Sequence, residues 1–502
     1  MPCTTILVGK NASYDGSTII ARNEDAPNGQ FTPKRVDVVL PADQPRVYRS
    51  VIAHLTVDLS DLEPQRYTSV PNAQLDEGLW ASAGINASNV AMSATETITS
   101  NERVLGADPL VRLVAAKGAP GEPGYEPEVP GGLGEEDLVT LVLPYIHSAR
   151  EGVLRLGALL ERYGTYEMNG IAFSDLDEIW WLETIGGHHW IARRVPDDSY
   201  VTMPNQLGID WFDLSDAEGA GRDCLCSPDL RQWMADNHLD LTIRPQGSTA
   251  NVFNPRAVFG SASDADHVYN TPRAWSMQRH LNPRSNCWDG PQADYTPESD
   301  DIPWCRTPER LLTIEDVKYV LSLHYQGTPF DCYDNLGTPE SRKRYRPIGI
   351  NRNCQLAVLQ LRPYVPADRC GVQWMALGSN PFNVLVPLYT AVDKVPAYLG
   401  QTPEQVDTDS FYWANRLIAA LADHQFNACA ADIERYQLKM GALAHQLLAQ
   451  TDASVADDAT TLLEEANERL AQELRRQTDD LLAKVLHIAS LGMRNAFARS
   501  DG

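Results

Sequence analysis

Basic residues are scarce in this sequence of 502 residues. It carries 42 Lys and Arg against 67 Asp and Glu, which gives a formal net charge of −25. Nucleic-acid binding needs clustered cations that displace counterions from phosphates, so we expect no nucleic-acid partner. The acidic balance instead suits a soluble enzyme that acts on small, cationic molecules.

Long apolar runs are also lacking. No stretch approaches the ~18–20 apolar residues of a membrane-spanning helix, so we expect no membrane association. The opening has neither a basic start nor a signal-peptide cleavage site, because a polar turn follows "TTILVG" at once. These features predict a cytoplasmic protein.

Paired cysteine motifs are missing as well. The nine cysteines are scattered, no CxxC occurs, and the CxC of Cys224 and Cys226 has no counterpart elsewhere. Zinc sites and disulfide frameworks need such pairing, so we expect no metal, no cofactor, and mostly buried, reduced thiols. His188 and His189 look like a metal pair. Because adjacent residues of a strand point to opposite faces, we expect them not to share an ion.

The pattern of the chain predicts antiparallel sheets with helices set apart from them. Short β-branched runs joined by turn residues predict a hairpin over 3–25, a second over 79–98 and a meander over 170–206. Further strands are expected over 354–389. Helices are expected over 135–164, interrupted by Pro144, and over 313–325. This arrangement defines an α+β fold.

We divide the chain into a catalytic domain over 3–400 and a helical C-terminal region over 401–502. From about Asp409, apolar residues recur at spacings of three and four, as at Leu463, Leu470 and Leu474. Such a stripe either packs on the body or is buried against another subunit. Because the second arrangement joins copies of the chain, we expect a homo-oligomer.

Cys3 stands almost at the start of the chain and directly before a predicted strand. A cysteine at the true N-terminus carries its own base, because the α-amine has a pKa of about 7.7–8.0 and can take the thiol proton. Met1 and Pro2 must first be removed, since the nitrogen of Cys3 is otherwise an amide. The hairpin would hold the new terminus in the sheet.

Two longer motifs extend this observation. The opening "CTTILVGKNASYDGSTIIARNED" and the later "GHHWIARRVPDDSYVTMPNQ" resemble the cysteine dipeptidase family of bacterial dipeptidase A, to which the secernins are related. Bile-salt hydrolases and penicillin V acylases are more distant. The resemblance covers most of the chain and is weakest at 117–134 and in the helical end. It implies an N-terminal-nucleophile hydrolase with an αββα sandwich of antiparallel sheets.

The resemblance also implies roles for individual residues. Cys3 matches the nucleophile, Arg22 the cation that favours its thiolate, and Asp25 a carboxylate that orients the α-amine. Asn205 matches an oxyanion donor, and Arg273 matches a later site arginine. Without the resemblance, the Arg-Asn-Glu-Asp run around Arg22 is more typical of a solvated hairpin tip, and Asn205 is more typical of a turn.

The substrate is expected to differ from that of the acylases. They carry an asparagine after the second hairpin, where this chain has Thr95 and Glu96. Glu96 could pair with a substrate ammonium. It could equally be a surface residue at a strand end.

These residues predict a dipeptidase of broad specificity. Its partners would be small peptide substrates, and it would need no metal. The nearest alternative is an amidase or acylase on the same scaffold that acts on N-acyl or conjugated amino acids. A further alternative is a non-catalytic binding protein that never exposes Cys3.

Overall fold

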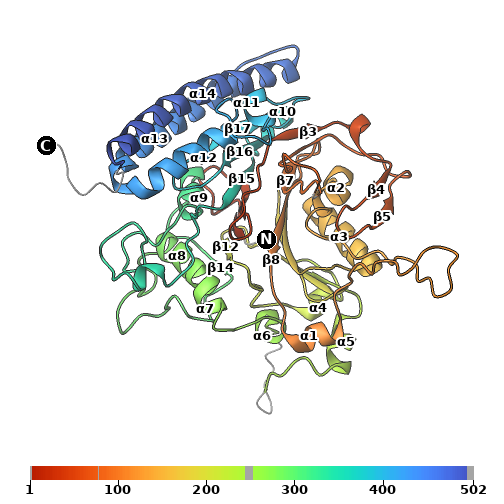
Figure 1. Ribbon diagram of the computed structural model, residues 1–502. Helices are drawn as coiled ribbons and strands as arrows, with labels where there is room; N and C mark the ends of the chain where they lie inside the picture. The colour runs from red at the N-terminus through yellow and green to blue at the C-terminus, as the bar shows by residue number, and fades with distance from the viewer. Residues whose placement is uncertain (1–2, 77, 244–252, 494–502) are drawn as a thin grey trace.

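The computed structural model describes residues 3–76, 78–243 and 253–493, with two β-sheets at its centre (Figure 1). The larger sheet has seven strands, all paired antiparallel. Their order is β14 (Cys305–Arg306), β12 (Tyr200–Met203), β1 (Cys3–Val8), β2 (Thr18–Asp25), β15 (Asn353–Leu361), β16 (Gly371–Leu377) and β17 (Val386–Tyr389).

The second sheet has six strands and is also antiparallel. Their order is β13 (Cys224–Cys226), β11 (Trp190–Arg194), β10 (Ile179–Thr184), β9 (Asn169–Ser174), β8 (Ala91–Thr97) and β7 (Ala83–Ile85). Two small ribbons pair β3 (Asp37–Val39) with β6 (Tyr67–Ser69), and β4 (Val47–Arg49) with β5 (Thr56–Asp58).

The helices of the described residues lie outside the sheets (Figure 1). They are α1 (Glu102–Ala107), α2 (Leu138–Val142), α3 (Ala149–Tyr163), α4 (Leu214–Ala217), α5 (Leu230–Asp236), α6 (Pro255–Phe259), α7 (Asp266–Tyr269), α8 (Thr271–Leu281), α9 (Ile314–Val320), α10 (Ala367–Cys370), α11 (Ala397–Gly400), α12 (Phe411–Ala422), α13 (Phe426–Asp452) and α14 (Ala459–Leu491). Across the described ranges, no helix is both long and apolar enough to cross a bilayer. The expected α+β class is confirmed.

Apolar cores fill the spaces between the layers of sheets and helices. Leu7 and Ile20 belong to a core that also contains Trp181 of the second sheet, whereas Ile6 and Val8 pack toward the helices on the other side. Alternation along β1 explains this, because successive side chains point to opposite faces. Cys3 shares the face of Leu7 and therefore points toward the second sheet.

The outer face of each sheet is covered by helices. α2 and α3 pack on the second sheet, where Trp180 and the helix residue Val153 share one core. The chain breaks at Pro144 between these helices, as expected, and α3 ends at Gly164, whose φ of +67° suits glycine. On the larger sheet, α8 contacts β12, α12 contacts β16, and α13 and α14 contact β17. The C-terminal helices therefore pack on the body within one chain.

Candidate active site

Cys3 is the first residue of β1 and is completely buried. Antiparallel pairing sets Cys3 opposite Glu24 and Thr5 opposite Arg22. The side chains of Cys3 and Arg22 therefore emerge on one face as diagonal neighbours. Arg22 Nη1 donates a hydrogen bond to Cys3 Sγ at 3.0 Å. The predicted contact between thiol and guanidinium is present.

The guanidinium of Arg22 is fixed from several sides. It donates to the carbonyls of Ala94 at 2.6 Å and Thr95 at 2.7 Å. These carbonyls reach it because the pairing of β8 with β9 shifts register between Ala94 and Glu96, which leaves Thr95 in a bulge. The Oγ1 of Thr95 is buried and has no hydrogen-bond partner among the described residues. Thr95 thus serves the site through its backbone.

A buried ion pair supports Arg22 from behind. Glu24 lies 3.3 Å from Arg22 Nη2 and 2.6 Å from Lys34 Nζ, and all three side chains are nearly or fully buried. Burial opposes ionisation of Glu24, but Lys34 and Arg22 hold its pKa below the usual range. Breaking such a pair leaves an uncompensated buried charge, so this network rigidly positions the guanidinium.

The thiol experiences opposing effects. Burial raises the pKa of Cys3 well above its usual value, and the nearby Arg22 charge offsets part of that rise. Glu96 and Glu135 raise the pKa further. Burial is the largest of these effects, so the thiol is protonated at neutral pH and would need a base to become a thiolate.

Asn205 and Arg273 hold the backbone of Cys3 from the opposite side. Cys3 N donates to Asn205 Oδ1 at 3.3 Å, and Arg273 donates to the carbonyl of Cys3 and to the same Oδ1. Asn205 Nδ2 donates to Thr97 O at 2.9 Å. An amide NH2 carries two donors, and this bond uses one of them. The two predicted residues are thus brought to Cys3, with Oδ1 facing its nitrogen.

Asn270 braces this pair and was not singled out by the sequence. Its Oδ1 accepts from Arg273 at 2.9 Å, and its Nδ2 donates to the carbonyl of Asn205 at 3.1 Å and to Asp266 at 2.6 Å. Burial and the charge of Arg346 lower the pKa of Arg273 to about 10. The guanidinium therefore stays charged at neutral pH.

Asp25 lies at the end of β2 and is fully buried. Its carboxylate accepts from Arg346 and from Asn353 Nδ2. These two partners fix the carboxylate beside the edge of the site. The predicted role of Asp25, orienting the α-amine of Cys3, concerns a processed chain and stays a prediction.

Glu96 is not a surface residue. It is fully buried on β8, and its Oε2 accepts from Thr5 Oγ1 at 2.8 Å. Its Oε1 has no hydrogen-bond partner in the described structure. Burial raises the pKa of Glu96 to about 8, although Arg273 and Thr5 act in the opposite direction. A cation placed at this carboxyl would be stabilised.

A second carboxylate reaches the thiol from a distant part of the sequence. Glu135 Oε1 lies 3.4 Å from Arg22 Nη1, the same nitrogen that contacts Cys3 Sγ. The backbone N of Glu135 donates to Glu167 Oε1 at 2.7 Å. Burial and the charge of Glu135 raise the pKa of Glu167. The acidic run before α2, which the sequence pattern predicts only as the start of a helix, contributes to the site.

A cavity of about 870 Å³ opens beside Asn205. Its polar lining includes Thr97, Asp266, Tyr269 and Asn270. Two of these residues, Thr97 and Asn270, hydrogen-bond Asn205 directly. The cavity therefore offers room for a small polar molecule next to the backbone of Cys3.

The expectation that His188 and His189 point to opposite faces is wrong. Both residues precede β11, in a turn, and both Nδ1 atoms approach Asp108, at 3.1 and 2.8 Å. Strand alternation does not apply in a turn. These contacts and two backbone N–H bonds hold the pKa of Asp108 below its usual range despite burial.

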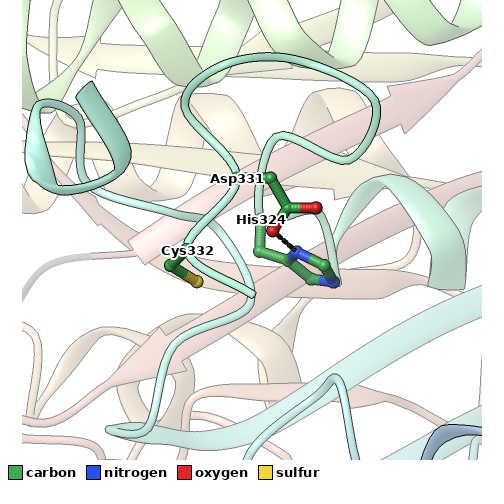
Figure 2. A group of neighbouring side chains, drawn as sticks. All are labelled: His324, Asp331 and Cys332. Carbon is green, nitrogen blue, oxygen red and sulfur yellow. Dashed lines mark hydrogen bonds and ion pairs between the residues drawn. The ribbon is translucent and has the colours of Figure 1, made fainter. Parts of the chain in front are cut away.

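Among the residues that the structure describes, one cluster brings three side chains of metal-ligand type together, namely His324, Asp331 and Cys332 (Figure 2). His324 Nδ1 and Asp331 Oδ1 lie 2.7 Å apart, which is a hydrogen-bond distance, and Asp331 also accepts from Tyr333 N. Figure 2 shows the sulfur of Cys332 to one side of this pair. The geometry is that of a hydrogen-bonded brace for the loop after α9.

A buried cysteine at the first position of a strand, held by arginines on both sides and flanked by carboxylates, defines a candidate cysteine hydrolase. Comparison with known proteins gives the family. The model of peptidase family C69 matches residues 2–439. The chain belongs to peptidase family C69 and is a cysteine-type peptidase.

Individual relatives cover the whole chain. It is 56% identical over 543 aligned residues to a protein named dipeptidase from Bifidobacterium longum (strain NCC 2705), with 100% of both chains covered. It is 54% identical over 501 residues to probable dipeptidase A of Streptococcus pyogenes serotype M3 (strain SSI-1), also with 100% of both covered. Dipeptidase A of Lactobacillus helveticus is 44% identical over 492 residues, with 96% of each chain covered. The resemblance predicted from the two motifs is confirmed.

Proposed function

We propose that this chain is a dipeptidase of the N-terminal-nucleophile type, with Cys3 as its nucleophile. The observation that carries the proposal is the 3.0 Å contact between Cys3 Sγ and Arg22 Nη1. Cys3 is the third residue of the sequence. The names of the relatives support dipeptides as substrates. The two packed sheets between helical layers support the expected αββα sandwich.

The proposed mechanism begins with removal of Met1 and Pro2. The freed α-amine of Cys3 takes the thiol proton, and the sulfur attacks the peptide carbonyl to form a tetrahedral intermediate. The second N–H of Asn205 and backbone amides stabilise its oxyanion. The protonated amine then gives its proton to the leaving amino group as the C–N bond breaks. Water attacks the thioester, releases the first amino acid and restores the thiol.

Substrate recognition is proposed to use the two carboxylates that flank the thiol. Glu96 and Glu135 are the carboxylates that act on the pKa of Cys3. In a dipeptide the α-ammonium is bonded to the carbon next to the scissile carbonyl, so it must lie close to the attacking sulfur. An ammonium group has three donors and can pair with both carboxylates at once.

The enzyme is proposed to work in the cytoplasm as a homo-oligomer. Its nine cysteines are all free, which supports a reducing compartment. Exposed Leu438 and Leu486 on α13 and α14 support self-association. Light scattering of the purified protein tests whether it is a homo-oligomer.

Intact-mass analysis alongside activity tests the proposed nucleophile. Active protein should begin at Cys3, and a Cys3→Ala variant should be inactive. Fully active enzyme that retains Pro2 would exclude the α-amine as base. Turnover of N-acyl amino acids in preference to free dipeptides would favour an acylase on the same scaffold.

A further inference from the structure

Three arginines surround Tyr269 at the edge of the site. The guanidinium groups of Arg273 and Arg346 each lie 5.1 Å from the centre of the Tyr269 ring. Arg352 Nη2 donates to the Tyr269 hydroxyl at 2.9 Å. Tyr269 also lines the cavity beside Asn205. Positive charge is thus concentrated next to the space in which a substrate would lie.

Two of these arginines are committed within the protein. A guanidinium has five N–H donors, and Arg273 makes five hydrogen bonds. Its acceptors are the carbonyls of Cys3 and Tyr269 and side-chain oxygens of Thr4, Asn205 and Asn270. Arg346 is neutralised by its ion pair with Asp25. Neither has the capacity to bind a further anion strongly.

Arg352 differs from both. Within the described parts of the chain, the bond to Tyr269 is the one hydrogen bond of its side chain, and its buried Nε has no partner there. No carboxylate of the described residues lies within ion-pair distance of it. Its carbonyl accepts from Ala26 N, directly after Asp25, so the backbone is anchored at the catalytic end of β2. Arg352 is a half-buried cation with donors to spare.

The site therefore has acidic side chains at one end and a basic side chain at the other. Glu96 and Glu135 lie at the thiol, and Arg352 lies beyond Tyr269. A free dipeptide has the same polarity, because its α-carboxylate follows the scissile bond by one residue, about 3.5 Å of extended chain. A carboxylate matches the planar fork of an arginine, which can bind both oxygens.

We propose that Arg352, held by the Tyr269 hydroxyl, binds the α-carboxylate of the leaving amino acid and so restricts the enzyme to dipeptides. The inference rests on the proposed dipeptidase function and adds its second recognition element. A longer peptide or a C-terminal amide would leave the guanidinium without its anion. Because an unpaired polar group in a site discriminates strongly, such substrates would be turned over poorly.

The test compares alanylalanine with its C-terminal amide. In Arg352→Ala, kcat/KM for the dipeptide should fall about 10- to 100-fold, as for loss of a charge-assisted hydrogen bond, mainly through KM. Hydrolysis of the amide should change less than about twofold, and Arg352→Lys should restore part of the loss. Tyr269→Phe should show the same pattern more weakly. Arg344→Ala, whose side chain pairs with Glu298, is the control.

A binding experiment separates this inference from the proposed function. Calorimetry on Cys3→Ser, with and without Arg352→Ala, should show tighter binding of the dipeptide than of its amide only when Arg352 is present. Equal losses for both substrates in Arg352→Ala, or an unchanged dipeptide KM, would overturn the inference. Carboxylate-dependent binding without any Cys3-dependent turnover would instead refute the proposed function and leave the carboxylate site standing.

Discussion

The sulfur of Cys3 and Nη1 of Arg22 lie 3.0 Å apart in a part of the protein that excludes solvent from both side chains. Burial disfavours a thiolate, and the adjacent cation favours it. Burial prevails, so the pKa of Cys3 is raised. In the proposed mechanism, this pair positions the nucleophile before it is activated. The freed α-amine would then supply the base.

The first prediction concerns the thiol. Cys3→Ser should lose most turnover, because an alcohol is much harder to deprotonate than a thiol, whose reference pKa is about 8.5. Iodoacetamide should inactivate the wild type, and EDTA should leave its rate unchanged. Rates of dipeptide hydrolysis before and after each treatment provide the measurement.

Two exposed cysteines could confuse the alkylation result, so the control removes them. Cys287 and Cys332 are the exposed thiols of the described chain. A Cys287→Ser/Cys332→Ser protein should keep full activity and should still be inactivated. Activity lost to EDTA and restored by zinc would show a metallopeptidase instead.

The second prediction concerns Asn205. Asn205→Ala should lower kcat by roughly 10²- to 10³-fold with little change in KM, the loss typical of one oxyanion donor. The variant also removes the acceptor of Cys3 N and of Arg273. Gln206→Ala is a matched control, since that neighbouring amide contacts the carbonyl of Ser261. A change confined to KM would assign Asn205 to substrate binding.

Much of the site could be predicted because it is built by local pairing. Cys3 and Arg22 belong to one hairpin, and its register alone makes them neighbours. The break at Pro144 and the end of α3 at Gly164 also follow from single residues. The family followed from two motifs. The first covers β1 and β2, and the second covers β11 of the second sheet and β12, which pairs with β1.

Other parts depend on contacts that the sequence does not encode locally. Glu135 is 113 positions from Arg22 and reaches it only when α2 packs on the second sheet. The carbonyl of Thr95 contacts Arg22 because of a β-bulge, and no residue type in this segment predicts that bulge. The sequence pattern predicts a strand that starts at His188, whereas the strand begins two residues later, at Trp190.

The third prediction concerns stability and pH. Burial raises the pKa of Glu96 to about 8, whereas glutamate in an unfolded chain titrates near 4.3. Between these values the folded state holds a proton that the unfolded state has released. The contribution of Glu96 to the free energy of unfolding is therefore present below about pH 4 and lost as pH rises toward 8.

Denaturant unfolding of Cys3→Ala at pH 5, 6.5 and 8 checks this expectation. Adding Glu96→Gln should flatten the decline with pH, because glutamine does not titrate. Exposed Glu404→Gln should leave the slope as it is. Identical slopes with and without Glu96 would mean that the carboxyl ionises normally in the folded protein.

The last prediction concerns the substrate ammonium. Glu96→Gln and Glu135→Gln should each raise KM for a dipeptide by about tenfold or more, because an ammonium loses a charge-assisted partner. Hydrolysis of the N-acetylated dipeptide, slow in the wild type, should be spared. Glu102→Gln is the control, since Glu102 lines the same cavity beside Asn205 and is exposed. Kinetics of both substrates on all four proteins give the comparison.

Proton release distinguishes the two carboxylates. Without a cation Glu96 is mostly protonated at pH 7, since its pKa is about 8. An arriving ammonium favours the carboxylate, so dipeptide binding to Cys3→Ser should release a proton, visible by calorimetry in buffers of different ionisation enthalpy. Glu96→Gln should abolish that release and Glu135→Gln should keep it. Binding without proton release would assign the ammonium to Glu135 alone.

A wild type that prefers the acetylated substrate would remove the need for either carboxylate and make the enzyme an acylase.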